Sequence, residues 1–200
     1  RRDVMINVMY DYVNRFKDLD LNYVRQQMSD FFDSDVPGHL NEEDLIGFYR
    51  EQLRKACGVP YAADLTVQDP CRDRTKFRLV LGTHHEAALV LFRNVEKQVL
   101  GGEAPAIRTA AKEADRLDRT NQLALLPPCL PIVDLYSEIQ KTGFQKVEVQ
   151  LAKILEEEGP QHFKTLRPRF LQECHISESD LKSLLWQWKS TGRLQLQGLE

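Results

Sequence analysis

The sequence predicts a mixed α/β protein in two parts: an α/β domain over residues 1–126 and a small, mainly helical domain over residues 145–200. Three observations carry this prediction. Two neighbouring runs of alternating apolar residues in the first part indicate paired strands, and apolar residues at helical spacing fill the second part. Between the two parts, the stretch LLPPCLP holds three prolines, so we assign residues 127–144 to a linker and one helix.

Composition narrows the class of protein. Of the 200 residues, 42% are hydrophobic and 28% are charged, as in soluble globular domains. The net charge of −3 argues against a surface built as a whole for nucleic acid. The four cysteines are far apart and form no C-x-x-C pair, which indicates reduced thiols and argues against a zinc site. Because no apolar run reaches about 18 residues and no signal peptide is recognisable, we expect a cytoplasmic protein.

The first strand is expected at residues 4–9, a continuous apolar run of the kind that a parallel sheet buries on both faces. Asn7 lies within this run, where a buried structural amide is favoured over a role in a site. This apolar strand begins only three residues after Arg1, and no Met precedes it. We therefore expect the domain to begin further upstream.

A helix and a hairpin are expected next. Asn41, followed by three acidic residues, predicts the N-cap of a helix, and Gly58 predicts its C-terminal cap. Residues 61–68 and 76–81 then alternate between apolar and polar side chains, with the turn PCRDR between them. This pattern predicts an antiparallel hairpin.

The dipeptide His84-His85 follows the second of these strands. Gly82 ends the strand, and Thr83 is expected to cap a helix whose first turn holds both histidines. A cation at this position opposes the helix dipole, so neutral imidazoles in a helix start are favoured over catalytic or ligand roles. The buried face of the helix is expected to consist of Ala88, Leu91, Phe92, Val95 and Val99.

The glycines of the stretch LGGEAP are expected to end this helix. In the second domain, helices are expected in VDLYSEIQ, QKVEVQLAKILEEE and LRPRFLQECH, with Pro168 acceptable only in a first turn. Ser177 and Asp180 form a capping arrangement that opens a last helix, and RLQLQ alternates like a strand. Three short helices and a strand form the order of a winged helix that lacks most of its wing.

Four segments occur along the chain in this order: DVMINVMYDYVNRF, LIGFYREQLRKACGVPY, RTKFRLVLGTHHEAALVLFRNVEK and DRTNQLALL. Together with the winged-helix-like tail, they resemble the three-Cys-motif partner (TcmP) family of bacteria, S-adenosylmethionine-dependent methyltransferase-like proteins. The resemblance covers nearly the whole chain. It implies the C-terminal half of a Rossmann-like class I methyltransferase sheet, which ends in an antiparallel edge hairpin.

The resemblance also implies a cofactor and a partner. S-adenosylmethionine is expected for the full-length protein, and the partner is expected to be the missing N-terminal half or a three-Cys-motif protein. Methyltransferases of this class hold the cofactor with a Gly-rich turn after the first strand and an acid ending the second. The chain contains no such Gly-x-Gly turn before a helix. We therefore assign no catalytic, cofactor-binding or metal-binding residue, and we expect this chain alone to be inactive.

The tail leaves two other functions open. The first is nucleic-acid binding through the last helix, although residues 145–200 hold eight Lys or Arg and eight Asp or Glu. Glu178 and Asp180 at the start of that helix are expected to repel phosphates, so nucleic acid is possible but not favoured. The second is contact with a protein partner, for which Trp186, outside the leucine stripe, is a candidate anchor.

Overall fold

The structure is a computed structural model. It describes residues 2–10, 13, 15, 21–35, 40–69, 71, 74–120 and 135–195. The proline-rich stretch predicted as a linker, residues 125–131, lies outside the described residues.

The chain divides into two compact units. Unit 1 consists of Arg1–Leu89 and Ala106–Pro131, and unit 2 consists of Val90–Pro105 and Ile132–Glu200. Residues 90–105, which the sequence analysis placed in the α/β domain, are thus part of the second unit. The two units are considered separately below.

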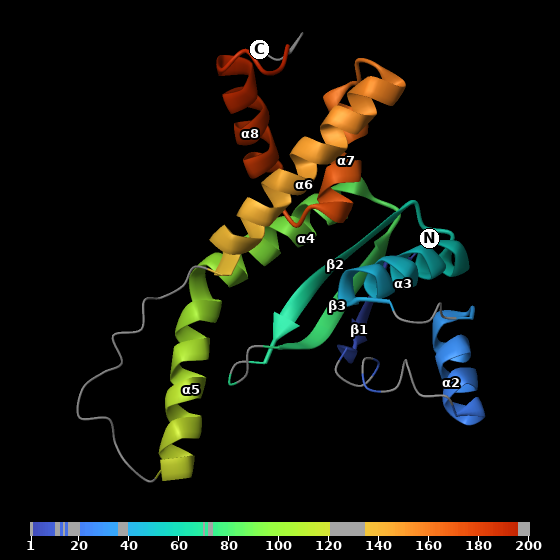
Figure 1. The fold of residues 1–200 in the computed structure, drawn as a ribbon, viewed down its shortest axis with the longest axis vertical. Helices are drawn as coiled ribbons and strands as arrows, with labels where there is room; N and C mark the ends of the chain where they lie inside the picture. Colours follow the sequence, from blue (N-terminus) through green and yellow to red (C-terminus); the bar gives the residue numbers. More distant parts are fainter. Residues whose placement is uncertain are drawn as a thin grey trace. The chain divides into compact units, whose positions relative to one another are not determined.

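Unit 1 contains a three-stranded antiparallel sheet in the order β1-β3-β2 (Figure 1). Its strands are β1 (Val4–Val8), β2 (Tyr61–Gln68) and β3 (Thr75–Thr83). The predicted hairpin of β2 and β3 is confirmed, with Leu65 opposite Leu79. The mixed α/β character predicted from the sequence is confirmed for the described residues.

Strand β1 differs from the expectation of a strand buried on both faces in a parallel sheet. It runs antiparallel to β3, with Ile6 opposite Val80. Its side chains alternate in burial, because Val8 is 2% exposed whereas Met5 is 58% exposed. A continuous apolar run predicts a strand, but it does not report the direction of the neighbouring strand or which face is covered.

Helices α2 (Asn22–Phe32) and α3 (Glu42–Cys57) complete the core of unit 1, and α3 packs on β2 and β3 (Figure 1). Both predicted caps of α3 are confirmed. The Oδ1 atom of Asn41 accepts a hydrogen bond from the Asp44 amide at 2.9 Å, and Gly58 adopts a φ of 61°. The buried core consists of Val8, Tyr10, Val13, Val24, Met28, Phe32, Leu45, Ile46, Tyr49, Leu53 and Val80.

Helix α4 (Glu86–Gln98) does not end at the glycine pair. A π-helical turn, η1 (Val99–Glu103), follows it directly, and α5 (Ala104–Thr120) follows η1 without a loop. The predicted break is therefore wrong. A π turn has wider i→i+5 hydrogen bonding, and here it contains both glycines within continuous helical backbone.

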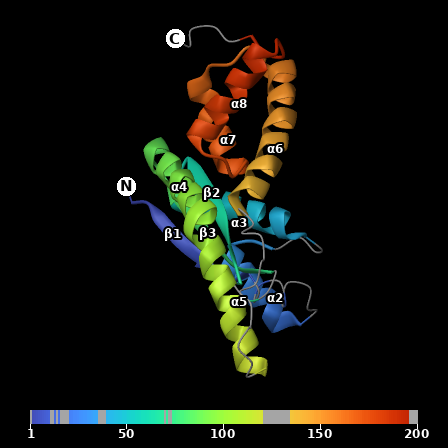
Figure 2. The ribbon, with the colours of Figure 1, turned by 90° about the vertical axis from the view of Figure 1, so that its left-hand side faces the viewer.

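Unit 2 also contains α6 (Leu135–Glu158), α7 (Phe163–Glu173) and α8 (Glu178–Ser190), shown in Figure 2. The sequence predicted two helices where α6 is one. Gly143 lies within α6, and a Cβ atom there would lie 2.2 Å from the carbonyl oxygen of Cys174. This glycine therefore allows a close approach of two backbones and does not break the helix.

Two further details of unit 2 differ from the predictions. Pro168 is buried in the middle of α7 and not in its first turn; its nitrogen has no hydrogen to donate within the helix. Residues 193–195 of the predicted strand are not in a strand, and residues 196–197 lie outside the described residues. The core of unit 2 consists of Val147, Leu151, Leu166, Phe170, Cys174, Ile176, Leu181, Leu184, Leu185 and Trp188.

Candidate functional site

His84 and His85 lie between β3 and α4, before the helix begins at Glu86. The Oγ1 atom of Thr83 accepts a hydrogen bond from the His85 amide at 3.0 Å. The His85 carbonyl accepts the first helical hydrogen bond, from Ala88 N at 3.1 Å. The prediction that both histidines lie in the first helical turn is wrong. The hydrogen bond from the His85 amide to the Thr83 side chain forms a short turn, and the helix starts after it.

The immediate polar partner of this turn is Asp3. Its Oδ1 atom accepts a hydrogen bond from the His84 amide at 3.0 Å, and this bond lowers the pKa of the Asp3 carboxyl. No group of three His, Cys, Asp or Glu side chains in the described part of the chain is arranged to hold a metal ion. The contacts of the turn with Asp3 and Thr83 are made by the backbone of His84 and His85.

Asn7 lies on β1 opposite Leu79, and its side chain is exposed. The expectation of a buried amide is therefore wrong. Successive side chains of a strand point to opposite faces, and Ile6 and Val8 occupy the face that packs on the core.

A buried ionic network joins the sheet to α3 in unit 1. The Nη1 atom of Arg78 donates to Asp64 Oδ2 at 2.8 Å, and its Nε and Nη2 atoms donate to Glu42 and Glu43 at 2.7 and 2.6 Å. Arg50 lies 3.2 Å from the other oxygen of Asp64. Burial alone would lower the pKa of Arg78, but the three carboxylates outweigh it and raise that pKa. The network holds the sheet and the helix together.

Helix α4 presents an unexpected face to the interior. Phe92 is buried as predicted, but its other buried residues in unit 2 are Arg93 and Glu96. The predicted burial of three aliphatic residues is wrong: Leu91, Val95 and Val99 are 64%, 45% and 43% exposed. The prediction of a helix was correct, but the charged pair, rather than the aliphatic stripe, faces inward.

Arg93 is buried because it caps the C-terminal end of α7. Its Nε atom donates to the Leu171 carbonyl at 2.6 Å, and its Nη2 atom donates to the Gln172 carbonyl at 3.1 Å. Carbonyls in the last turn of a helix lack partners within the helix, and a cation there also complements the helix dipole. His175 then continues the chain at a φ of 51°, with Nδ1 3.0 Å from Oε1 of Glu96.

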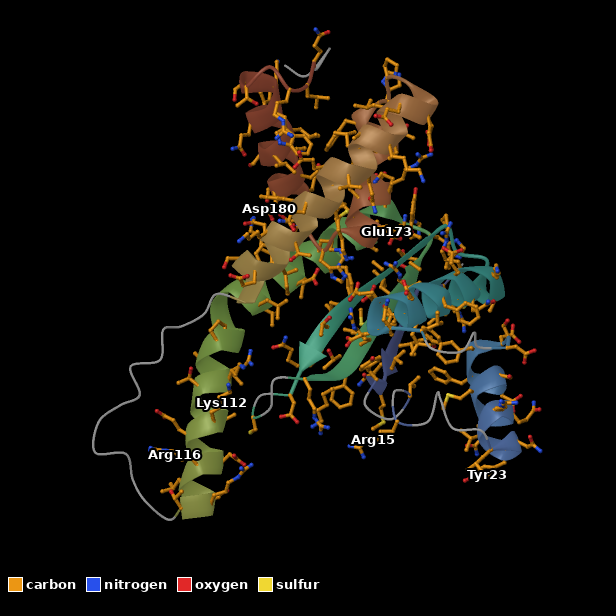
Figure 3. The ribbon with its side chains drawn as sticks, viewed as in Figure 1. Arg15, Tyr23, Lys112, Arg116, Glu173 and Asp180 are labelled. Atoms are coloured by element: carbon orange, nitrogen blue, oxygen red, sulfur yellow. The ribbon has the colours of Figure 1, made fainter. Side chains whose placement is uncertain are left out.

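Asp180 faces the interior of unit 2 at the first turn of α8, where Figure 3 labels it. Its Oδ2 atom accepts hydrogen bonds from the Tyr136 hydroxyl and the Ser177 hydroxyl, each at 2.6 Å. Its Oδ1 atom accepts from Lys97 Nζ at 2.8 Å. The predicted capping box with Ser177 is confirmed. Burial alone would raise the pKa of Asp180, but these donors outweigh it and lower the pKa.

The solvent-exposed side of α8 differs in composition from the buried side that carries Asp180. We call it the α8 face, and it consists of the exposed Ser179, Lys182, Ser183, Trp186, Gln187 and Ser190, with the half-buried Lys189 at its edge.

Trp186 is 46% exposed, and the ammonium of Lys189 lies 4.3 Å from the centre of its ring. The sequence analysis singled out Trp186 but missed this neighbour. Their spacing of three residues on a helix was the available signal.

Comparison with protein-family models, with curated protein sequences and with solved structures found no match to this chain. None of the helices in the described ranges is long and apolar enough to cross a membrane. The arrangement of the strands and the composition of the α8 face are therefore the observations that bear on function.

Proposed function

We propose that this chain is the C-terminal portion of an S-adenosylmethionine-dependent methyltransferase-like protein whose cofactor-binding half lies outside the chain. The observation that carries the proposal is the place of β3. It lies between β1 and β2 and runs antiparallel to both, so β1 and β2 run in the same direction. The class I methyltransferases that the sequence resembles end a parallel sheet with an antiparallel hairpin, and that ending has this arrangement.

The free edge of β1 also supports the proposal. Among the described strands, β3 is the neighbour of β1, which leaves the backbone groups along the other edge of β1 for a further strand. Met5, on the face of β1 away from α3, is largely exposed. In the proposed protein, the preceding strands of the sheet pair along this edge and their helices cover this face.

Methyl transfer itself needs mainly the orientation of the sulfonium and the acceptor, often with a base. In this proposal the present chain supplies the last strands and unit 2. The residues that hold S-adenosylmethionine belong to the preceding half, and a three-Cys-motif protein is the proposed partner of the whole.

Calorimetric titration tests the proposal. The isolated chain is expected to bind S-adenosylmethionine no more tightly than about 1 mM, about −4 kcal/mol. The proposed full-length protein, which includes the cofactor-binding half, is expected to bind it in the micromolar range. A micromolar constant for the isolated chain would show that the cofactor site is not in a missing half. Absence of binding by the longer protein would contradict the methyltransferase assignment.

A further inference from the structure

The α8 face is locally cationic, in a unit that holds 11 Lys or Arg and 12 Asp or Glu. Lys182 and Lys189 are its charged residues, and the described residues of this face include no acid. The other exposed positions are serine and glutamine, with Trp186 between the two lysines along the helix. Such a surface offers hydrogen-bond donors and positive charge together with one large apolar ring.

The two acids at the start of α8 do not oppose an approaching anion as the sequence predicted. Asp180 points inward and is held by Lys97, Tyr136 and Ser177. Glu178 is half-buried and lies 3.2 Å from Arg167 and 2.6 Å from Lys182. The side chain of Lys182 is itself 50% exposed, so its ammonium is accessible to a phosphate.

Trp186 is not required by the core of unit 2. Trp188, two residues further, is 8% exposed and fills the interior on the opposite side of α8. The indole of Trp186 is 46% exposed, and the Lys189 ammonium lies over its ring at 4.3 Å from the ring centre. An aromatic ring beside cations is the combination that stacks an unpaired base and neutralises its phosphates.

We propose that the α8 face binds single-stranded nucleic acid. An unpaired base stacks on Trp186, and Lys182, Lys189 and the neighbouring serine hydroxyls donate hydrogen bonds to the phosphates that flank it. Duplex DNA is disfavoured, because a helix in a groove needs more cations than the two present here, and a paired base does not offer its ring. The proposal concerns unit 2 and does not depend on the methyltransferase assignment.

Fluorescence anisotropy of a labelled oligonucleotide of about 15 unpaired nucleotides tests the proposal with the whole chain. At about 50 mM salt we expect a dissociation constant in the tens of micromolar, with a salt slope of about −1.4 for two phosphate contacts. Trp186→Ala is expected to weaken binding about tenfold or more, whereas Trp186→Phe keeps a stacking ring and stays within about threefold. Lys189→Ala is expected to reduce the slope by about 0.7.

Lys153→Ala is the matched control, since Lys153 is an exposed lysine of α6 in the same unit, 71% exposed and 3.9 Å from Glu157. It is expected to leave the affinity unchanged. Three results would overturn the proposal: no change with Trp186→Ala, tighter binding of a duplex of the same length, or equal competition by polyglutamate. The last of these would identify an acidic protein segment as the partner. Thermal unfolding of each variant shows whether its fold is retained.

Discussion

The guanidinium of Arg93 and the carboxylate of Glu96 lie 2.6 Å apart, and their side chains are 0% and 1% exposed. The pair is three residues apart on α4 and is enclosed by the end of α7. Desolvating two charges is costly, so such a pair stabilises a fold only when its remaining hydrogen-bonding groups are also satisfied. The carbonyls of Leu171 and Gln172 meet this condition for Arg93.

Removal of one member of this pair is expected to destabilise unit 2 strongly. Glu96→Ala leaves a buried guanidinium without its carboxylate, which costs about 3–5 kcal/mol in the free energy of unfolding. The control is Arg169→Ala, which breaks the exposed pair of Arg169 and Glu158, and its cost is expected to be below about 1 kcal/mol. Urea unfolding followed by tryptophan fluorescence measures both. Equal costs for the two variants would contradict the role given to burial.

Acid is expected to destabilise unit 2 through Glu96 and Asp180. Burial alone would raise the pKa of Glu96, but Arg93 and His175 outweigh it, and the pKa is lowered, as is that of Asp180. The unfolded chain therefore binds protons first as the pH falls below about 4.3. The stability that these groups contribute is fully present above that pH and is lost as the pH falls through their folded-state pKa values.

Urea midpoints measured between pH 7 and pH 3 test this dependence. Asp180→Asn removes one of the two groups, so its midpoint is expected to fall less steeply with acid than that of the parent chain. Parallel pH profiles for the two proteins would show that Asp180 does not titrate with a lowered pKa.

Gly143→Ala is expected to be strongly destabilising. The added Cβ would lie 2.2 Å from the Cys174 carbonyl oxygen and 2.5 Å from Ile176 Cγ2, so α6 must move, at a cost of about 3 kcal/mol or more. Gly47 is the matched control, because it lies within α3 and a Cβ there meets nothing within 4 Å. Gly47→Ala is expected to stabilise α3 by about 0.5–1 kcal/mol. Thermal unfolding followed by circular dichroism compares the two.

Substitution of His84 and His85 is expected to change the free energy of unfolding less than substitution of Thr83. Replacing His84 and His85 together with Asn keeps both backbone amides, and we expect a change of about 0.5 kcal/mol or less. Thr83→Val removes the buried oxygen that accepts the His85 amide, at an expected cost of about 1–2 kcal/mol. Circular dichroism during urea unfolding measures both. A larger effect of the histidine pair would assign a role to the rings.

Three local signals of the sequence predicted local structure correctly. Asn41 and Gly58 were recognised as the caps of α3 because capping depends on residues within one helical turn. The hairpin of β2 and β3 was recognised because both strands alternate across a short turn. Ser177 and Asp180 were recognised as a capping box for the same reason as the caps of α3.

The orientation of α4 could not be predicted in this way. Its period allows either the stripe of Leu91 and Val95 or the side of Arg93 to face inward. The choice depends on carbonyls of Leu171 and Gln172, about 80 residues further along the chain. The inward direction of Asp180 likewise depends on Tyr136 and Lys97, which no pattern around α8 reveals.

The two tryptophans of the chain, Trp186 and Trp188, both belong to unit 2, one exposed and one buried. Tryptophan fluorescence therefore reports the melting of unit 2, whereas the far-ultraviolet dichroism of the helices reports both units. If the two transitions coincide, unit 1 and unit 2 unfold as a single cooperative system. If the transitions are separate, each unit has its own free energy of unfolding. A substitution in unit 2 is then expected to leave the melting of unit 1 unchanged.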